Sequence, residues 1–292
     1  MEKHHYTVFL PPDKSWTIRM GVLDLLNKKP DTLRLLEKAP NLPTDLTALV
    51  RASKDWVEPR RPIHVGESGT LYRFLLFASW KLGTERTFVV ERSLRHRKIT
   101  LDPAIVTWSI KDLLKLDNET SQWASAAVLW EKDPDPVADP PPKLTLTYEA
   151  VRHWRARREK GECWDIRLDA TIQKQMEALL KGLEERRMSF TPHHSEDYCF
   201  ARAFNLVSPG EGIMLWPSLQ SHESNRIMEM ESGLTQYMHR GETITSQDHR
   251  VIQAITLKAL MEGKKDVLGR IRHKNCVLKS WPLFWEFLRE VS

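Results

Sequence analysis

The chain has few cysteines, and they are not spaced for a disulfide framework. Its 292 residues include Cys163, Cys199 and Cys276, which are widely separated and contain no Cys-x-x-Cys pair. An odd, scattered set of thiols argues against the disulfide-stabilised architecture of small secreted domains. We therefore expect a protein of a reducing compartment, the cytoplasm.

Long apolar segments are also missing. The longest apolar run, Phe74 to Trp80, is far shorter than the ~20 residues of a membrane-spanning helix. The N-terminus shows no basic stretch followed by an apolar one, so we expect no leader peptide. The sequence thus predicts a chain with no membrane partner.

A strong excess of one charge is absent as well. Lysine and arginine total 44 against 39 acidic residues, which gives a net charge of +5. The densest basic cluster, 152–160, is interrupted by Trp154, Ala156 and Glu159, so nucleic-acid binding is a weak interpretation and we expect no nucleic-acid partner. A mildly basic chain with 41% hydrophobic residues suits an anionic substrate and is long enough for two domains.

A strand-to-helix junction is the first feature that points to a site. Tyr6–Leu10 is a β-branched and aromatic run that predicts a strand, and two prolines end it. A helical pattern follows, with Ser15 as the expected N-cap and with Lys14 and Arg19 beside it. Backbone N–H groups at a helix start, joined by two cations, form a site for an anion. A capped helix with solvated cations is the alternative interpretation.

A second junction of the same kind lies at 66–70, a glycine-containing turn before a predicted helix. Leu71 and Phe74 fall on the buried side of that helix, which leaves Arg73 facing a polar region. A strand is predicted at 87–90, followed by the basic segment 94–98. Strands are also expected at 32–36, at 143–148 and before Trp216.

Motifs at these junctions recur in a known order. Residues 11–19 read Pro-x-Asp-Lys-Ser-x-x-x-Arg, and residues 66–73 read Gly-x-x-Gly-Thr-x-x-Arg. Both resemble motifs of the enolpyruvyl transferases, and specifically of the EPSP synthase (3-phosphoshikimate 1-carboxyvinyltransferase) family. The family has asparagine where this chain has Glu67, so a carboxylate stands near the expected anion site.

The later motifs of the family follow in the same order. Residues 222–226 resemble Lys-Glu-x-Asp-Arg, with His222 and Asn225 as departures. Residues 248–250 read Asp-His-Arg, and residues 279–284 resemble the closing Lys-Ser-x-Pro-x-Phe. The resemblance spans nearly the whole chain, with a large deletion near 187–191.

The resemblance implies a fold and a domain division. It predicts an α/β protein, a two-lobed inside-out α/β barrel of βαβαββ units that is shortened by the deletion. Residues 13–188 would form the N-terminal, acceptor-binding lobe, and residues 1–12 with 189–292 the C-terminal lobe. Missing units expose sheet edges, which a homodimer would cover.

The resemblance also implies an activity. The chain would be a transferase that moves the enolpyruvyl group of phosphoenolpyruvate to a hydroxyl of shikimate 3-phosphate or of a related anionic alcohol, without a metal or cofactor. Catalysis is implied for Lys14, Asp197, Glu223 and His249. Substrate binding is implied for Lys14, Ser15, Arg19, Arg73, Arg97, Gln175, Asp197, His222, Arg226, Arg250 and Lys279.

The acceptor site departs most from the family pattern. The family has Ser-Ser-Gln where this chain carries Gln173, Lys174 and Gln175, so the hydroxyls that bind the acceptor phosphate are missing. We therefore expect weak binding of shikimate 3-phosphate.

Other interpretations stay open at this point. One is a non-catalytic relative that keeps an anion-binding cleft, which the substitutions at Glu67, His222 and Asn225 favour. Glu223 and Arg226 alone would be an ordinary ion pair on a helix. The cluster of His193, His194, Glu196 and Asp197 has no standard metal-ligand spacing.

Overall fold

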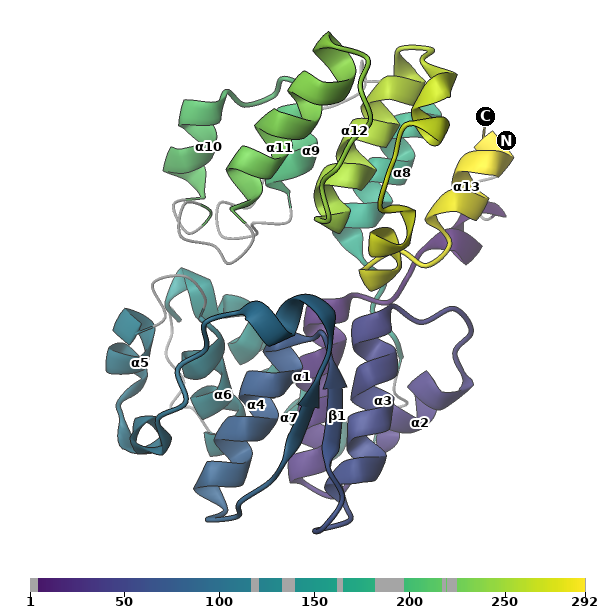
Figure 1. Ribbon diagram of the computed structural model, residues 1–292. Coiled ribbons are helices and arrows are strands. Elements are labelled where there is room, and N and C mark those ends of the chain that lie inside the picture. Colours follow the sequence, from purple (N-terminus) through teal and green to yellow (C-terminus); the bar gives the residue numbers. More distant parts are fainter. Residues whose placement is uncertain are drawn as a thin grey trace. The chain divides into compact units, whose positions relative to one another are not determined.

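The structure is a computed structural model that describes residues 5–116, 121–132, 140–161, 165–181, 197–216, 219 and 225–291. The chain folds as two compact units. We call Pro12–Arg167 the N-terminal unit, and Met1–Pro11 together with Leu168–Ser292 the C-terminal unit. Figure 1 shows the elements of each.

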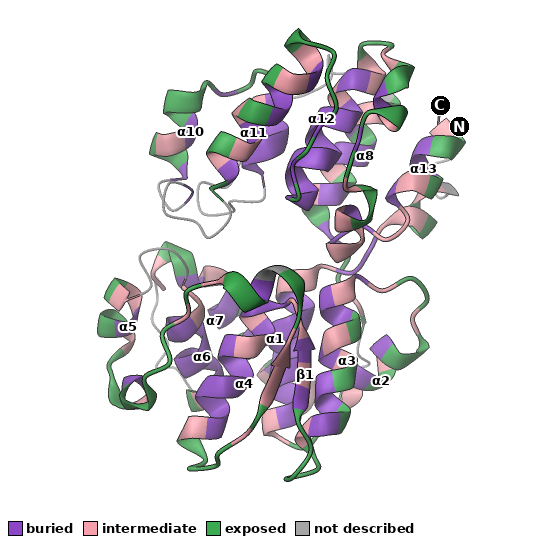
Figure 2. Ribbon diagram, in the orientation of Figure 1, coloured by how far each residue is buried: buried purple, intermediate pink, exposed green. Residues whose placement is uncertain are grey.

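Buried helices form the centre of the N-terminal unit. Helix α1 (Lys14–Leu26) packs against α3 (Thr44–Trp56), α4 (Gly69–Lys81), α6 (Gln122–Glu131) and α7 (Thr145–Lys160). All of its residues from Trp16 to Leu25 are buried, so α1 is surrounded rather than laid on a surface (Figure 2). The other elements are α2 (Asp31–Lys38), η2 (Arg92–His96), η3 (Pro103–Thr107), α5 (Ile110–Leu116) and η4 (Pro142–Leu144).

A small parallel sheet accompanies these helices. Strand β1 (Ile63–Gly66) pairs with β2 (Phe88–Val90), and Ile63 lies opposite Phe88. Helix α4 connects the two strands, which makes a β-α-β unit. The predicted strand at 87–90 is confirmed, and the described residues are mostly helical with this small sheet, which agrees only in part with the expected α/β fold. Among the described residues the sheet has two strands and closes no barrel.

The C-terminal unit is built around α12 (His249–Met261). This helix packs against α8 (Ala170–Lys181), α9 (Tyr198–Ala203) and α11 (Arg226–Leu234), and its residues from His249 to Leu257 are buried. The remaining elements are η1 (His5–Phe9), α10 (Pro209–Leu215), the π-helical turn η6 (Thr235–His239), η7 (Lys265–Gly269), η8 (Lys274–Lys279) and α13 (Phe284–Val291).

Helix α8 belongs to the C-terminal unit, whereas the division made from the sequence assigns it to the other lobe. Its Ile172 and Met176 lie in the hydrophobic core that α9 and α12 share. The chain passes between the units at Pro11–Pro12 and again at Arg167–Leu168. A pattern of apolar residues predicts a helix but does not say which core the helix joins.

The strand predicted at the N-terminus is wrong, because this segment is the 3₁₀ helix η1. Tyr6 and Phe9 contact the ring of Phe287 with centroid distances of 6.2 and 5.8 Å. The indole Nε1 of Trp281 donates to the carbonyl of Phe9 at 2.9 Å. Packing on α13 thus decides the conformation of a run whose composition favours a strand.

Three further predicted strands are helical. Segment 32–36 lies in α2 and segment 143–148 in η4 and α7. Before Trp216 the chain forms α10, whose start is fixed by a capping box between Ser208 and Glu211 with Pro209 in the first turn. In α10 this capping box outweighs the short apolar run that suggested a strand.

The described helices are also too short or too polar for a bilayer. None of them has the length and apolar character needed to span a membrane.

Candidate functional site

The turn before α4 is the most constrained junction of the N-terminal unit. Gly66 ends β1 with a φ of +57°, a conformation that favours glycine. The Ser68 side chain then accepts from the N–H of Leu71 at 3.5 Å and so caps α4. The carbonyl of Gly66 accepts from the N–H of Glu91 at 2.7 Å, which fixes the turn to the chain that follows β2.

Two arginines meet at this turn. A Cβ placed on Gly69 would lie 3.0 Å from Nη1 of Arg97 and 3.1 Å from Nη1 of Arg73. Both guanidinium groups therefore reach the same point, beside the first N–H groups of α4. Arg73 is buried, and its Nη1 donates to Oε1 of Gln122 at 2.7 Å. A methyl group at position 69 would press on both guanidinium groups, so glycine leaves them the most room.

Glu67 places a carboxylate in the same turn. Its Oε1 lies 3.5 Å from Nη1 of Arg92. Arg92 begins η2, the segment that leads to Arg97. The structure therefore pairs this carboxylate with an arginine of the segment that follows β2.

The start of α1 carries the other predicted residues of this unit. Asp13, rather than Ser15, caps the helix by accepting from the N–H of Trp16 at 3.0 Å. The Nζ of Lys14 lies 3.3 Å from Oδ2 of the buried Asp45. Lys14 is therefore held by an ion pair to α3, and the role of Ser15 is to offer its carbonyl to Arg19 at 2.7 Å.

A buried chain of hydroxyls orients Arg19. Its Nε donates to Oγ1 of Thr147 at 2.8 Å, and that hydroxyl donates to Oγ of Ser125 at 2.9 Å. The guanidinium carbon lies 5.6 Å from the centre of the Phe74 ring, a cation–π contact. Three helices thus fix one side chain.

Sequence reasoning missed the residues that orient Arg19 and Arg73. Gln122 and Ser125 lie three positions apart on α6, so the same helix end contacts Arg73 directly and Arg19 through Thr147. Thr147 comes from α7. Nothing in their local sequence marks these three polar residues, because their partners lie far away along the chain.

In the C-terminal unit, Asp248 caps α12 and binds an arginine. Its Oδ1 accepts from the N–H of Arg250 at 2.8 Å, and its Oδ2 accepts from Nε of Arg226 at 2.9 Å. Burial alone would raise the pKa of Asp248. The charges of Arg226 and His249 and these hydrogen bonds outweigh burial and hold the pKa below its usual range.

A second capping aspartate holds Arg250. Asp169 accepts from the N–H of Ile172 at 2.9 Å at the start of α8, and its Oδ2 lies 3.4 Å from Nη2 of Arg250. Arg250 is one of the largest fully buried side chains. His249 is buried beside it, and Lys279 is half-buried at the end of η8, which packs against α12.

Asp197, the expected contact of the acceptor hydroxyl, is buried. It accepts from Oγ1 of Thr171 at 3.0 Å and lies 4.0 Å from Nζ of Lys174. Gln175, the expected substrate ligand on the same helix, is 1% exposed, and its Oε1 accepts no hydrogen bond from the described residues. The structure therefore brings Asp197 together with Lys174 and places Gln175 in the interior.

Other predicted residues lie outside the described residues. These are His222 and Glu223, together with His193, His194 and Glu196 of the weighed metal cluster. Within the ranges that the structure does describe, no group of histidine, cysteine, aspartate and glutamate side chains is arranged to hold a metal ion.

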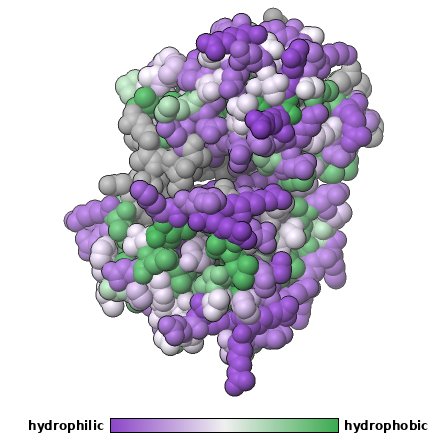
Figure 3. Space-filling view, in the orientation of Figure 1, coloured by the Kyte–Doolittle hydropathy of each residue, from purple (hydrophilic) through white to green (hydrophobic). Residues whose placement is uncertain are grey.

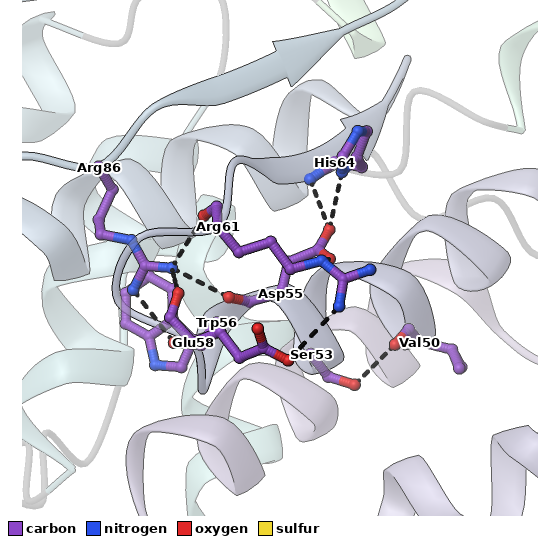
Figure 4. A network of polar contacts seen from close by, with 8 residues as sticks. All are labelled: Val50, Ser53, Asp55, Trp56, Glu58, Arg61, His64 and Arg86. Atoms are coloured by element: carbon purple, nitrogen blue, oxygen red, sulfur yellow. Dashed lines mark hydrogen bonds and ion pairs between the residues drawn. The ribbon is translucent and has the colours of Figure 1, made fainter.

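Another polar cluster, at the end of α3, serves the fold (Figure 4). The fully buried Asp55 accepts from the backbone N–H of His64 at 3.0 Å and contacts Arg61 at 2.7 Å. Arg86 donates to the carbonyls of Trp56 and Asp55 at 3.1 and 3.0 Å, and to two further carbonyls of the same turn. These bonds satisfy helix-end carbonyls and join α3 to β1, which explains the cluster without a ligand.

Comparison with known proteins gives no match: no protein-family model, no curated protein and no solved structure matches the chain. The resemblance to the enolpyruvyl transferases therefore rests on the short motifs and their order.

Proposed function

We propose that this protein is an enolpyruvyl transferase of reduced size, with phosphoenolpyruvate as donor and an anionic alcohol as acceptor. The order of the five motifs supports the proposal. The single structural observation that carries it is the meeting of Arg73 and Arg97 at Gly69. This pair of arginines lies wholly within the N-terminal unit.

Paired guanidinium groups at a helix start suit a donor with several negative charges. Each can bind a carboxylate or phosphate through two parallel N–H donors. The α4 N–H groups add the positive end of a 13-residue helix. The basic segment after β2 supplies further positive charge, and Figure 3 shows a band of hydrophilic side chains across this face of the unit, with hydrophobic patches beside it. A small, triply charged donor matches this arrangement.

The reaction needs proton transfer as well as charge neutralisation. The methylene carbon of phosphoenolpyruvate takes a proton, the acceptor oxygen adds to the central carbon, and the adduct then loses phosphate together with a methyl proton. The resemblance assigns this acid and base work to the carboxylates of Asp197 and Glu223. The products are the enolpyruvyl ether of the acceptor and inorganic phosphate.

Titration calorimetry with phosphoenolpyruvate tests the donor site. Arg97→Ala removes one or two charge-assisted hydrogen bonds, so we expect affinity to fall roughly tenfold to a hundredfold. Arg95→Ala is the matched control, because it removes the same charge from an exposed neighbour whose Nε donates to the carbonyl of Val90. Affinity should change little in this control. Equal affinity in the wild type and in Arg97→Ala would refute the placement of the site.

A phosphate-release assay tests the reaction itself. Purified protein is mixed with phosphoenolpyruvate and a panel of anionic alcohols that includes shikimate 3-phosphate. We expect turnover with at least one acceptor, a high KM for shikimate 3-phosphate because its serine pair is missing, and loss of turnover in Glu223→Gln with donor binding kept. Release of phosphate at the same rate by Glu223→Gln would assign the proton transfer to another residue.

One observation favours a second candidate function, anion binding without catalysis. Asp197 is buried and engaged by Thr171 and Lys174, whereas a base for the acceptor hydroxyl must reach that hydroxyl. This alternative predicts that phosphoenolpyruvate binds with dependence on Arg97 and that no acceptor gives phosphate release.

The proposal includes a finer architecture, the shortened two-lobed barrel of the family. Its support is a chain that leaves one unit after Pro11 and returns to it at Leu168. A shortened sheet exposes edges that a second copy of the chain would cover. We therefore expect a homodimer, and light scattering on the purified protein tests this expectation.

A further inference from the structure

Glu67 is an acidic side chain in a turn where two arginine side chains meet. It lies two residues before Gly69, the point that Arg73 and Arg97 both reach. Its side chain is 17% exposed, whereas that of Arg92, its partner at 3.5 Å, is 69% exposed. The carboxylate is therefore set into the turn, and Arg92 approaches it from the solvent side.

The backbone around Glu67 explains why it stays there. The carbonyl of Gly66 accepts from the N–H of Glu91 at 2.7 Å, so the chain after β2 is fastened to the turn on one side of Glu67. On the other side, Ser68 caps α4. The side chain of Glu67 is thus attached to a backbone that is hydrogen-bonded at both neighbouring residues.

We infer that Glu67 is an internal counter-ion of the Arg73 and Arg97 pair, and that an anion entering the α4 site has to compete with it. Two guanidinium groups at one point repel each other, and a nearby carboxylate lowers that repulsion. The same carboxylate repels an incoming anion. Glu67 therefore sets how strongly the site discriminates among anions of different charge. The inference rests on the anion binding proposed above and assigns a specificity-determining residue to it.

The electrostatics predict a graded effect. Repulsion between Glu67 and a ligand grows in proportion to the charge of the ligand. In a partly solvated site, removing one nearby negative charge should strengthen binding roughly two- to fivefold for each charge on the ligand. A general loosening of the turn would instead change all affinities in the same direction and by similar factors.

The test compares Glu67→Gln with the wild type by titration calorimetry at low ionic strength. The probes are pyruvate with one charge, inorganic phosphate with about two at neutral pH, and phosphoenolpyruvate with about three. Glu85→Gln is the control, because Glu85 is exposed beyond the far end of α4 and its removal changes the net charge equally. We expect the gain in affinity to rise from pyruvate to phosphoenolpyruvate in Glu67→Gln and to be less than twofold in the control.

Thermal unfolding gives a second measurement that does not depend on a tight ligand. Without an anion, Glu67→Gln should unfold at a lower temperature than the wild type, because the two arginines lose their counter-ion. Added phosphate should raise the unfolding temperature more in Glu67→Gln than in the wild type. A variant that is destabilised equally with and without phosphate has only lost structure, and this result would overturn the inference.

The outcomes separate this inference from the proposed function. Equal affinities of the wild type and Glu67→Gln for phosphoenolpyruvate, both lost in Arg97→Ala, would overturn the role of Glu67 and leave the donor site standing. Binding that does not depend on Arg97 in either background would remove the donor site and the inference with it. Binding that is detected only in Glu67→Gln would support the inference in its strongest form.

Discussion

The two units hold the arginines that the sequence predicted for a site by different means. In the N-terminal unit, neutral oxygens orient Arg19 and Arg73, namely the hydroxyl of Thr147 and the amide of Gln122. In the C-terminal unit, the corresponding bonds to Arg226 and Arg250 come from Asp248 and Asp169. Both aspartates also cap the helices that follow them.

The two kinds of partner differ in what they do to a guanidinium group: one only orients it, and the other also neutralises its charge. A hydroxyl or an amide fixes the direction of a guanidinium group and leaves its charge in place. A buried carboxylate cancels the charge, and removing that carboxylate leaves a buried cation, which costs far more than losing a neutral hydrogen bond. The predicted arginines of the N-terminal unit are therefore the better candidates for binding an anion, whereas Arg226 and Arg250 depend more on their ion pairs.

The largest expected effect comes from breaking the Asp248 pair. Asp248→Ala removes a helix cap and leaves Arg226 buried without this carboxylate, so we expect the free energy of unfolding to fall by about 3 to 5 kcal/mol. The control is Asp102→Ala, which removes an exposed cap of η3 that accepts from the N–H of Ala104 and should cost about 1 kcal/mol. Urea denaturation measures both. Equal losses would show that the buried pair adds nothing to the cap.

The pH dependence of the same variant follows from the lowered pKa of Asp248. A carboxyl that ionises more readily in the folded state stabilises the protein above its ordinary pKa of 3.8, and that stabilisation is lost as the pH falls below it. The deficit of Asp248→Ala relative to the wild type should therefore shrink at acidic pH.

The N-terminal unit contains a buried carboxyl of the opposite kind. Burial raises the pKa of Asp24 from 3.8 to about 6, although Trp154 and Thr32 donate hydrogen bonds to it. The folded state thus holds the proton more tightly, so the free energy of unfolding should decrease by about 3 kcal/mol as the pH rises from about 4 to about 6.

Denaturation at several pH values checks the Asp24 prediction. In Asp24→Asn the decrease between pH 4 and 6 should be absent. Asp31→Asn is the control, because it removes another carboxylate partner of Arg158 and should leave the decrease in place. If the free energy of unfolding of Asp24→Asn decreased with pH as it does in the wild type, Asp24 would not be the cause of the decrease.

A smaller effect is expected from the hydroxyl chain. Thr147→Val keeps the shape of the side chain but removes the acceptor for Nε of the buried Arg19, so we expect a loss of about 1 to 3 kcal/mol. Thr147→Ser keeps the hydroxyl and should restore most of the loss attributable to the hydrogen bond. Chemical denaturation of the three proteins measures this. A serine variant no better than valine would show that the methyl group, not the hydroxyl, matters.

The smallest stability effect is expected at Gly69. A methyl group there presses on the ends of two arginine side chains, which can shift, so Gly69→Ala should weaken phosphoenolpyruvate binding while unfolding changes by less than about 1 kcal/mol. In the C-terminal unit, a methyl group on Gly212 would press on the buried ring of Tyr198, and Gly212→Ala should cost about 1 to 3 kcal/mol. If both variants lose stability equally, the proposed contrast between the units fails at these positions.

Helices with clear signals could be predicted from the sequence. The helices predicted after Ser15 and after the turn at 66–70 are confirmed as α1 and α4. Each has a strong apolar pattern or a capping residue close to its start. The predicted strands at 6–10, 32–36 and 143–148 are wrong, because short apolar runs do not distinguish a strand from one buried turn of helix.

The candidate site could be predicted only in part, because some of its residues act on partners that are distant in the sequence. Arg73 and Arg97 were expected from their motifs, and the structure brings them to the same glycine. Gln122 and Thr147 could not be expected, since their partners lie 49 and 128 positions away along the chain.

The sequence by itself determined that helices start close to Ser15 and Thr70 and that cations lie near both starts. Prolines, glycines and capping side chains act over a few residues, so their effect is readable without a fold. Only the tertiary structure decided which cations receive a carboxylate and which receive a neutral oxygen. That choice depends on long-range packing, because Asp169 reaches Arg250 and Ser125 reaches Thr147 only after separate helices have packed together.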